Sequence, residues 1–131
     1  MEKMNDELTQ KDPYGIKNVC FSRIEQDDKR WDVYKKQRCE RGFDNSELWS
    51  LDTTIAQFVL PRLKKFREIR CGQPTFMTDD EWDNAIASMI DAFDLIIKDN
   101  TDAVFKLSYE DNKKIRNGLS AFCGYFCHLW F

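Results

Sequence analysis

The stretch TDDEWDNAIASMIDAFDLII, residues 78–97, decides the fold of this chain. Its first residues form a capping-box pattern, in which Thr78 accepts from the amide three residues on and Glu81 reaches back. The large apolar residues that follow are spaced by four, three, four and four positions: Trp82, Ile86, Met89, Phe93 and Ile97. This spacing places them in one stripe of a helix and predicts an amphipathic helix with a well-defined start.

Two further stretches have the same periodicity. They are SELWSLDTTIAQFVLPRLKKFREI at residues 46–69 and NKKIRNGLSAFCGYFCHLWF at residues 112–131. Their expected buried faces are Leu48, Leu51, Ile55, Phe58, Val59, Leu63 and Phe66 in the first, and Ile115, Leu119, Phe122, Phe126 and Trp130 in the second. The apolar face continues in phase across Pro61, so we expect a kink there and a single helix. The predicted fold is all-α, a compact bundle of about four to five helices.

The N-terminal part of the chain has weaker signals. Residues 1–20 are polar and include the turn signal DPYG, which predicts a polar arm, and residues 21–131 are expected to form one helical bundle domain. Aromatic residues on a charged background predict a short amphipathic helix within residues 21–41, ended by Gly42 in the left-handed conformation. The next helix is expected to begin near residues 44–46, which offer capping side chains.

Charge and composition exclude several classes of protein. The 131 residues carry a net charge of −3, too small for electrostatic attraction to nucleic acid or lipid head groups. Residues 31–70 hold nine basic and six acidic side chains, whereas residues 71–131 hold five and ten. This asymmetry indicates either attraction between parts of the fold or a functional basic face. We do not expect long nucleic acid as a partner, because the acidic C-terminal half opposes it.

The location is predicted from what the sequence lacks. No apolar N-terminal segment has the form of a signal peptide, and no apolar run approaches the roughly 20 residues that span a bilayer. We therefore expect a cytosolic protein with no membrane partner. The five cysteines are odd in number and include no C-x-x-C pair, so we expect free thiols.

The histidine, cysteine and acidic residues are not arranged in any catalytic motif. His128, the only histidine, follows Cys127, but neighbours on a helix point about 100° apart, which disfavours a metal site or a nucleophile pair. The acidic cluster at residues 79–83 is explained by the positive end of a helix. We expect no catalytic residue, no metal and no cofactor.

Three motifs resemble one known family. They are R-G-F-x-x-x-x-L-W-x-L-D-x-x-I-A-x-F-V-L-P-R-L-K-x-F at Arg41–Phe66, G-x-P with M-T-D-D-E-W-x-x-x-I-x-x-M-I-x-A-F at Gly72–Phe93, and G-L-x-x-F-x-x-Y-F-x-x-L-W at Gly118–Trp130. Over residues 31–131 the chain is similar to small uncharacterised proteins encoded by tailed bacteriophages and prophages. The resemblance implies a phage accessory protein in the cytosol of an infected bacterium. It implies no activity and no catalytic residue.

A basic stretch at residues 61–70 suggests an anion site. Its charges are either a solvated helix face or, if the first two helices pack antiparallel, part of a surface that binds a nucleotide. Trp31, Tyr34 or Trp49 would stack on the base. Asp52, at the edge of the apolar stripe, is expected to be a buried carboxylate; it would form a structural ion pair or a hydrogen bond to a Trp indole, or it would face a pocket and accept from the ligand. The candidate ligand-binding residues are Arg38, Arg41, Trp49, Asp52, Arg62 and Lys65.

The C-terminal aromatics suggest an interface, because Tyr125, Trp130 and Phe131 would be unusual on a monomer surface. Three functions remain open. The first is a non-enzymatic phage binding protein that counters host defence, either by blocking a host protein or by sequestering a small nucleotide signal. The second is a homo-oligomeric assembly factor. The third is a small enzyme that processes nucleotides with carboxylate-bound magnesium.

Overall fold

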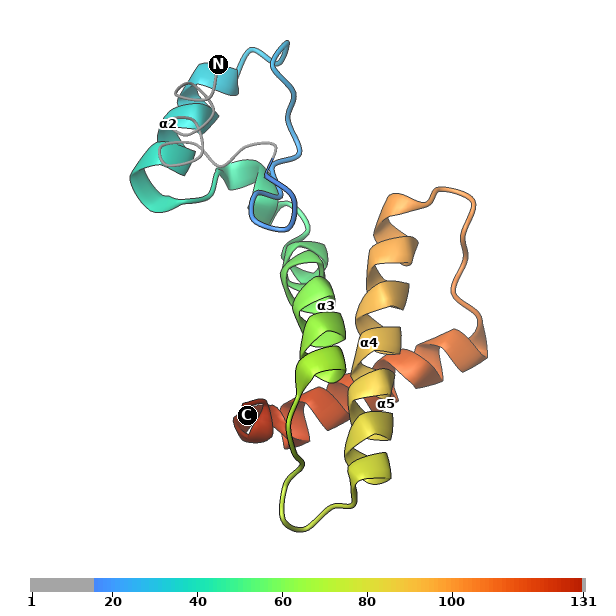
Figure 1. The fold of residues 1–131 in the computed structure, drawn as a ribbon. Helices are drawn as coiled ribbons and strands as arrows, with labels where there is room; N and C mark the ends of the chain where they lie inside the picture. The colour runs from blue at the N-terminus through green and yellow to red at the C-terminus, as the bar shows by residue number, and fades with distance from the viewer. Residues whose placement is uncertain (1–15, 131) are drawn as a thin grey trace. The chain divides into compact units, whose positions relative to one another are not determined.

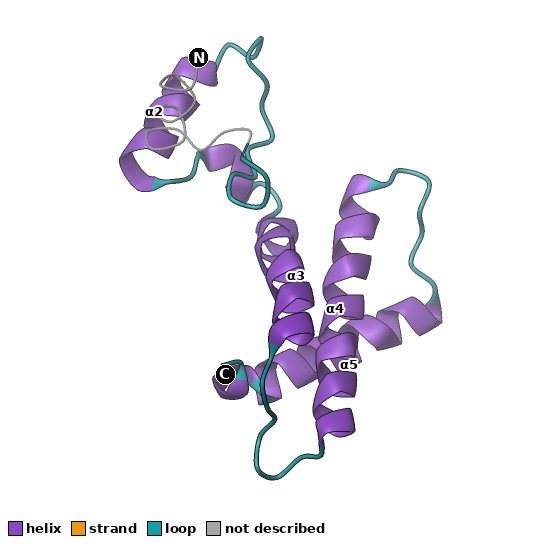
Figure 2. Cartoon of the chain, in the orientation of Figure 1, coloured by secondary structure: helices purple, strands orange, loops and turns teal. Residues whose placement is uncertain are grey.

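The computed structural model describes residues 16–130, and these are helical with no strand. The α-helices are α2 (Trp31–Arg41), α3 (Leu51–Ile69), α4 (Asp79–Thr101) and α5 (Tyr109–Gly124), and two 3-10 helices are η1 (Asn45–Leu48) and η2 (Phe126–His128). Figures 1 and 2 show their order along the chain. The all-α prediction, with about four helices, is confirmed.

Contacts divide the chain into two compact units, residues 1–55 and residues 56–131. We call them unit 1 and unit 2 and describe each by itself. The prediction of one domain beginning at residue 21 stays a prediction. Most of the predicted N-terminal arm, residues 1–15, lies outside the described residues, as does Phe131.

In the described part of unit 1, an extended segment lies near residues 21–25, where a helix was expected. Within the predicted stretch 21–41, the helix α2 begins only at Trp31. The amide of Phe21 donates to Glu47 Oε1 at 3.0 Å, and the amide of Arg23 donates to Ser46 Oγ at 2.8 Å. These side chains take the backbone donors that a helix would have used, so the segment stays extended.

The predicted helix end at Gly42 and the predicted cap near residues 44–46 are both present. Gly42 has φ of 86° and its amide donates to Arg38 O at 2.8 Å, which confirms the left-handed end of α2. Asp44 then caps the next turn in a capping box with Glu47. That turn is the 3-10 helix η1, and the α-helix α3 starts only at Leu51. The cap is therefore as predicted, but α3 begins later than expected.

Unit 2 holds the hydrophobic core. Figure 1 shows α3 and α4 running side by side, with α5 crossing them. The buried cluster consists of Ala56, Leu60, Leu63, Trp82, Ile86, Met89 and Phe93. The α4 stripe is confirmed from Trp82 to Phe93, with Ile97 half-buried beyond it. The capping box is also confirmed, because Glu81 N donates to Thr78 Oγ1 at 3.1 Å and Thr78 N donates to Glu81 Oε1 at 3.0 Å.

The buried face of α3 differs from the predicted one. Of the predicted stripe, Leu63 is buried and Val59 and Phe66 pack against the core, but four residues are exposed: Leu48, Leu51, Ile55 and Phe58. Ala56 and Leu60, which the stripe did not include, are buried in the core. The helix is apolar around more of its circumference than one core can cover. The small side chain of Ala56 lies on the buried side, and large apolar side chains remain at the surface.

The last helix is shorter than predicted. It ends at Gly124, and η2 follows, so Phe126 and Trp130 leave the α5 stripe and are exposed. The helix α5 approaches α4 closely at Gly118, where an added Cβ would overlap Ser88 O and Ala92 Cβ. Two backbones meet there, and only a residue without a side chain fits.

Candidate functional site

Arg38, the first residue of the predicted anion site, lies inside unit 1. Its guanidinium donates to Asp44 Oδ2 at 2.6 Å, and neither side chain is exposed. Its Cζ also lies 4.8 Å from the ring centroid of Trp31. Burial raises the pKa of Asp44, but hydrogen bonds from Ser22, Ser46 and Arg38 outweigh burial and hold that pKa below its ordinary value. A buried and paired guanidinium offers no surface to a ligand, so Arg38 is a structural residue, contrary to prediction.

Arg41 and Trp49 lie on the surface of unit 1 and already have partners. Arg41 donates from Nε to Phe43 O at 3.0 Å and from its terminal nitrogen to Asn45 Oδ1 at 2.6 Å. Arg30 Cζ lies 5.0 Å from the ring centroid of Trp49, where a base was expected to stack. Their roles as ligand-binding residues stay predictions.

Asp52 is exposed in the first turn of α3, so the expected buried carboxylate is wrong. Its Oδ1 accepts from Ser50 Oγ at 2.8 Å. This hydrogen bond, followed by one from the backbone of Thr53, lowers the pKa of Asp52. Its place at the positive end of a helix accounts for the charge without a ligand.

Arg62 and Lys65 lie in unit 2, on the exposed side of α3. Arg62 donates to Phe58 O at 2.9 Å, and its Cζ lies 3.7 Å from the Phe58 ring centroid. Lys65 Nζ lies 3.1 Å from Glu68 Oε1. Because Arg41 belongs to the other unit, the expected convergence of these cations with it stays a prediction.

The rest of the basic stretch joins α3 to α4. Arg67 and Asp83 form an ion pair at 2.9 Å, which raises the pKa of Arg67 and lowers that of Asp83. Arg70 pairs with Asp79 at 2.8 Å and donates to Gly72 O at 3.0 Å. Much of the charge asymmetry seen in the sequence is therefore attraction between neighbouring elements, and Arg70 fixes the loop that follows α3.

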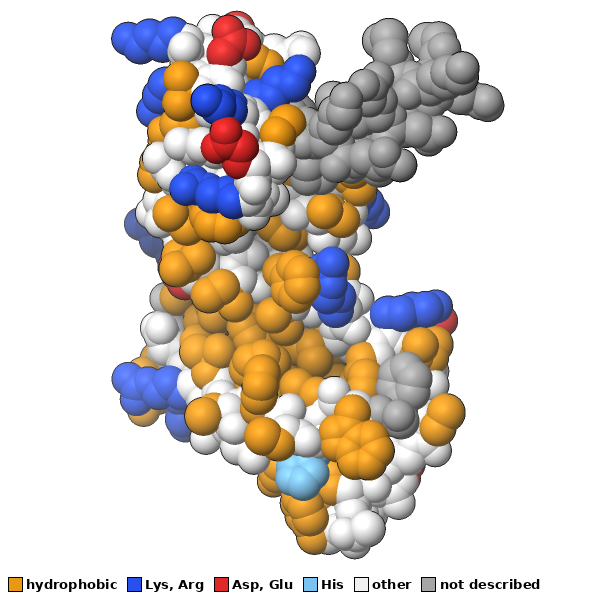
Figure 3. Space-filling model, turned by 90° about the vertical axis from the view of Figure 1, so that its left-hand side faces the viewer, with side chains coloured by type: hydrophobic (Ala, Val, Ile, Leu, Met, Phe, Trp, Pro, Cys, Tyr) orange, Lys and Arg blue, Asp and Glu red, His pale blue; other side chains and the backbone are white. Residues whose placement is uncertain are grey.

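A hollow lined mainly by apolar side chains lies between α3 and the C-terminal segment of unit 2. We call it the α3–α5 groove; its volume is about 240 Å³ and its lining is Phe58, Val59, Arg62, Leu63, Phe66, Phe122 and Leu129. Figure 3 shows hydrophobic side chains gathered over this face of the unit, around a hollow above the pale-blue His128. Large apolar side chains that stay at the surface beside such a hollow indicate a binding surface.

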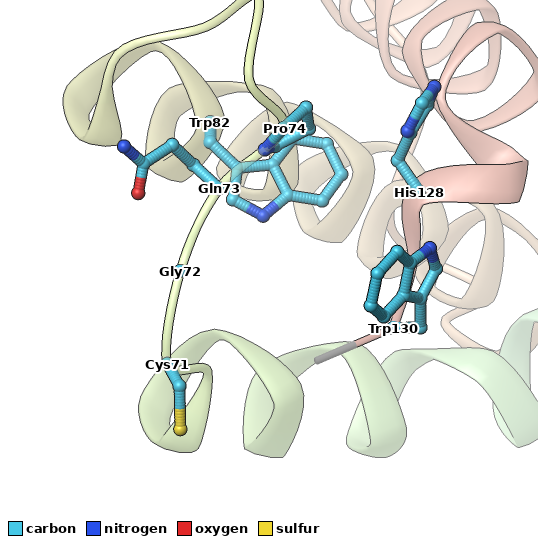
Figure 4. Close-up of a pocket in the computed structure, with 7 residues that line it drawn as sticks. All are labelled: Cys71, Gly72, Gln73, Pro74, Trp82, His128 and Trp130. Atoms are coloured by element: carbon cyan, nitrogen blue, oxygen red, sulfur yellow. The ribbon is translucent and has the colours of Figure 1, made fainter.

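A second hollow, of about 280 Å³, lies where the loop after α3 meets η2. We call it the aromatic pocket; it is lined by Cys71, Gly72, Gln73, Pro74, Trp82, His128 and Trp130. Figure 4 shows Trp82 and Pro74 on one side of it and His128 with Trp130 on the other. Phe76 packs edge to face on His128, with ring centroids 5.1 Å apart, and so fixes the orientation of that ring.

Trp82 has two roles at this pocket. Its side chain is 1% exposed and belongs to the core, where it packs edge to face on Tyr125 with ring centroids 5.9 Å apart. Figure 4 shows its indole nitrogen turned towards the space beside Gly72. This nitrogen is not among the buried polar atoms that lack a hydrogen-bond partner, so the N–H is open at the pocket to water or to an acceptor on a ligand.

The three predicted interface residues lie in different surroundings. Tyr125 is half-buried and packs on Trp82 within unit 2, so it serves the core. Trp130 is 74% exposed and lines the aromatic pocket. Phe131 lies outside the described residues. The expectation that these residues hold two copies of the chain together stays a prediction.

Neither hollow follows from the sequence pattern. The periodicity places Phe58, Phe122 and Trp82 on helix faces only. The available signal was the excess of large apolar residues on α3 over what one stripe can bury.

Several kinds of site are not seen among residues 16–130. No three His, Cys, Asp or Glu side chains gather into a group that could hold a metal ion, and no helix there has the length and apolarity to cross a bilayer. Four cysteines are exposed and form no disulfide: Cys39, Cys71, Cys123 and Cys127. No protein-family model, curated protein or solved structure matches the chain.

Proposed function

We propose that this chain is a non-enzymatic binding protein that holds a helix of a partner protein in the α3–α5 groove. The observation that carries the proposal is the groove itself, with Phe58 48% exposed at its edge. Amphipathic helices bind to such hollows through apolar residues at helical spacing. The exposed ring of Phe58 offers apolar area to a partner without disturbing the buried cluster.

The charges around the groove indicate what kind of helix fits. Arg62 is the one charged residue among the described residues that line it. The α3 segment 58–66 carries Arg62, Lys64 and Lys65 and no acidic residue, and the segment 119–130 carries neither an acid nor a Lys or Arg. A partner helix with carboxylates beside its apolar stripe would meet opposite charge and no like charge.

The phage resemblance at residues 31–131 supports a host protein as this partner, blocked by the phage protein in the host cytosol. Sequestration of a nucleotide is the weaker version. Its candidate Arg38 is buried against Asp44, and much of the basic stretch is paired with acidic residues. Protein binding needs none of these cations to be displaced.

A pair of helical peptides tests the proposal. Each is about 16 residues long, long enough to be helical, with Leu at helical spacing and either Glu or Lys beside the stripe. We expect the Glu peptide to bind and the Lys peptide to bind at least about tenfold more weakly, because only the first complements Arg62. Fluorescence anisotropy of labelled peptides measures both dissociation constants.

Three variants of the chain sharpen the test. Phe58→Ala removes apolar area and should weaken the Glu peptide about tenfold. Arg62→Glu should reverse the order of the two peptides. Val104→Ala is the matched control, because Val104 is 88% exposed and lines neither hollow.

Two results would overturn the proposal. Glu-peptide binding that is unchanged by Phe58→Ala and Arg62→Glu would place the peptide elsewhere on the surface. An oligomer in sedimentation that Phe58→Ala converts to a monomer would show that the occupant of the groove is a second copy of this chain.

A further inference from the structure

The aromatic pocket is a separate site from the α3–α5 groove. The two hollows have no lining residue in common. Its volume of about 280 Å³ lies just below the usual range for pockets that hold drug-sized ligands. A ligand of one or two fused rings suits a hollow of this size.

The walls of the pocket favour a planar ligand. Trp82 comes from α4 and Trp130 from the C-terminal segment, and Figure 4 shows their rings across the same space. The indole of Trp130 is 74% exposed, so a face of it is open to stacking. A flat aromatic ring would cover this apolar surface at little conformational cost.

The polar groups at the pocket restrict the ligand further. Its described lining includes no Asp, Glu, Lys or Arg, so no fixed charge is present to balance a charged ligand. The indole N–H of Trp82 is a donor turned towards the pocket. A ligand oxygen that accepts from this donor would take the place of water at the pocket surface and would orient the ring.

We propose that the aromatic pocket binds a neutral, planar heteroaromatic ring that carries a carbonyl oxygen, the chemistry of an oxo-nucleobase. The Trp82 indole N–H donates to that oxygen, and Trp130 stacks on the ring. His128, held by Phe76, closes the side of the pocket next to Trp130. The inference does not depend on the proposed function, because no residue of the groove takes part in it.

Two bicyclic probes test the inference on the full chain. Hypoxanthine has a ring carbonyl, whereas indole has a frame of the same size without an acceptor. The indole N–H signals of the four tryptophans are followed by proton–nitrogen correlation NMR, and single Trp→Phe variants assign them. We expect hypoxanthine to shift the signals of Trp82 and Trp130 saturably and to move the Trp82 proton downfield. Indole should not produce the downfield shift.

Variants at exposed positions keep the test independent of folding. Trp82→Phe alters the core, so Trp130→Ala is the informative change. It should weaken hypoxanthine about tenfold. Trp49→Ala removes a tryptophan that is 53% exposed in unit 1 and should have no effect.

Three results would overturn the inference. The first is the absence of any saturable shift at millimolar hypoxanthine. The second is an equal, linear shift of all four tryptophan signals, which would show unspecific stacking. The third is an identical Trp82 downfield shift with indole, which would remove the hydrogen bond from the assignment.

Discussion

The Arg38–Asp44 pair shows how strongly one side chain depends on its partner. The two groups lie 2.6 Å apart with neither exposed, and Asp44 also accepts from Ser22 Oγ and Ser46 N. Arg38→Met keeps the side-chain volume but leaves a buried carboxylate without its cation. We expect unit 1 to lose about 3 kcal/mol of stability. Hydrogen exchange of the α2 amides measures this loss for unit 1 specifically.

Arg41→Met is the control for this change, because Arg41 lies on the same helix and is exposed. It should alter stability by no more than about 0.5 kcal/mol. Equal protection of the α2 amides in both variants would contradict the structural role of Arg38.

Acid should weaken unit 1 for the same reason. The folded pKa of Asp44 is below its unfolded value, so the folded state binds fewer protons and stability rises with pH between the two values. The contribution is complete above the ordinary carboxyl pKa and is lost as pH falls through the folded one. Two other ionisable residues lie next to Asp44: Arg38 donates to its carboxylate, and Glu47 accepts from its amide in the capping box. Near-ultraviolet circular dichroism against pH measures the loss.

The Asp44→Asn variant should be less stable than the native chain at neutral pH. Its stability should also fall less steeply as the pH is lowered. Asp28 gives a background in both proteins, because Arg30 lowers its pKa to about 2 and its titration has the same sign. Identical acid profiles for the variant and the native chain would mean that Asp44 contributes nothing to the pH dependence.

Arg38 also shows why the sequence misassigned single residues. A cluster of cations in the sequence looks the same whether or not each cation has a partner. The partner Asp44 lies beyond the end of α2 and folds back through the left-handed turn at Gly42. Asp52 was misassigned in the opposite sense, because its apolar neighbours Leu51 and Ile55 are themselves exposed.

Helix packing in unit 2 depends on Gly118, and the chain provides a matched control. An added Cβ at Gly118 would overlap backbone and side-chain atoms of α4, whereas at Gly124 it would meet nothing within 4 Å. Gly118→Ala should therefore destabilise the chain by about 1–3 kcal/mol, even though alanine favours a helix. Gly124→Ala should be neutral or stabilising by up to about 1 kcal/mol. Urea unfolding compares the two, and equal midpoints would contradict the close approach.

The helices could be predicted to different degrees. The helix α4 was predicted from its cap to Phe93, because a capping box and one long stripe agree on it. The buried face of α3 was not, since periodicity gives weight to large side chains and the structure buries the small Ala56. The apolar pattern of α5 continued past Gly124, but the backbone turns there into η2, so the stripe overran the helix.

For the chain as a whole, only the fold class could be predicted from the sequence. The all-α fold follows from three amphipathic stretches, but the hollows do not. Each is built from segments far apart in sequence: α3 with α5 and Leu129 for the groove, and the Cys71–Pro74 loop with Trp82 and His128 for the pocket. Their positions depend on how the helices cross, and a pattern within one helix contains no information about that crossing.

The stretch 128–130 lines both hollows in alternation. His128 and Trp130 face the aromatic pocket, and Leu129 lines the groove. An occupant of either hollow that restrains this stretch changes the conformational freedom left for the other, so the two affinities become one linked quantity. By reciprocity, the factor by which a bound ring changes the affinity for a helix equals the factor by which the bound helix changes the affinity for the ring. If both proposals hold, adjacent residues of one short stretch would therefore link the binding of a ring in the pocket to the binding of a helix in the groove.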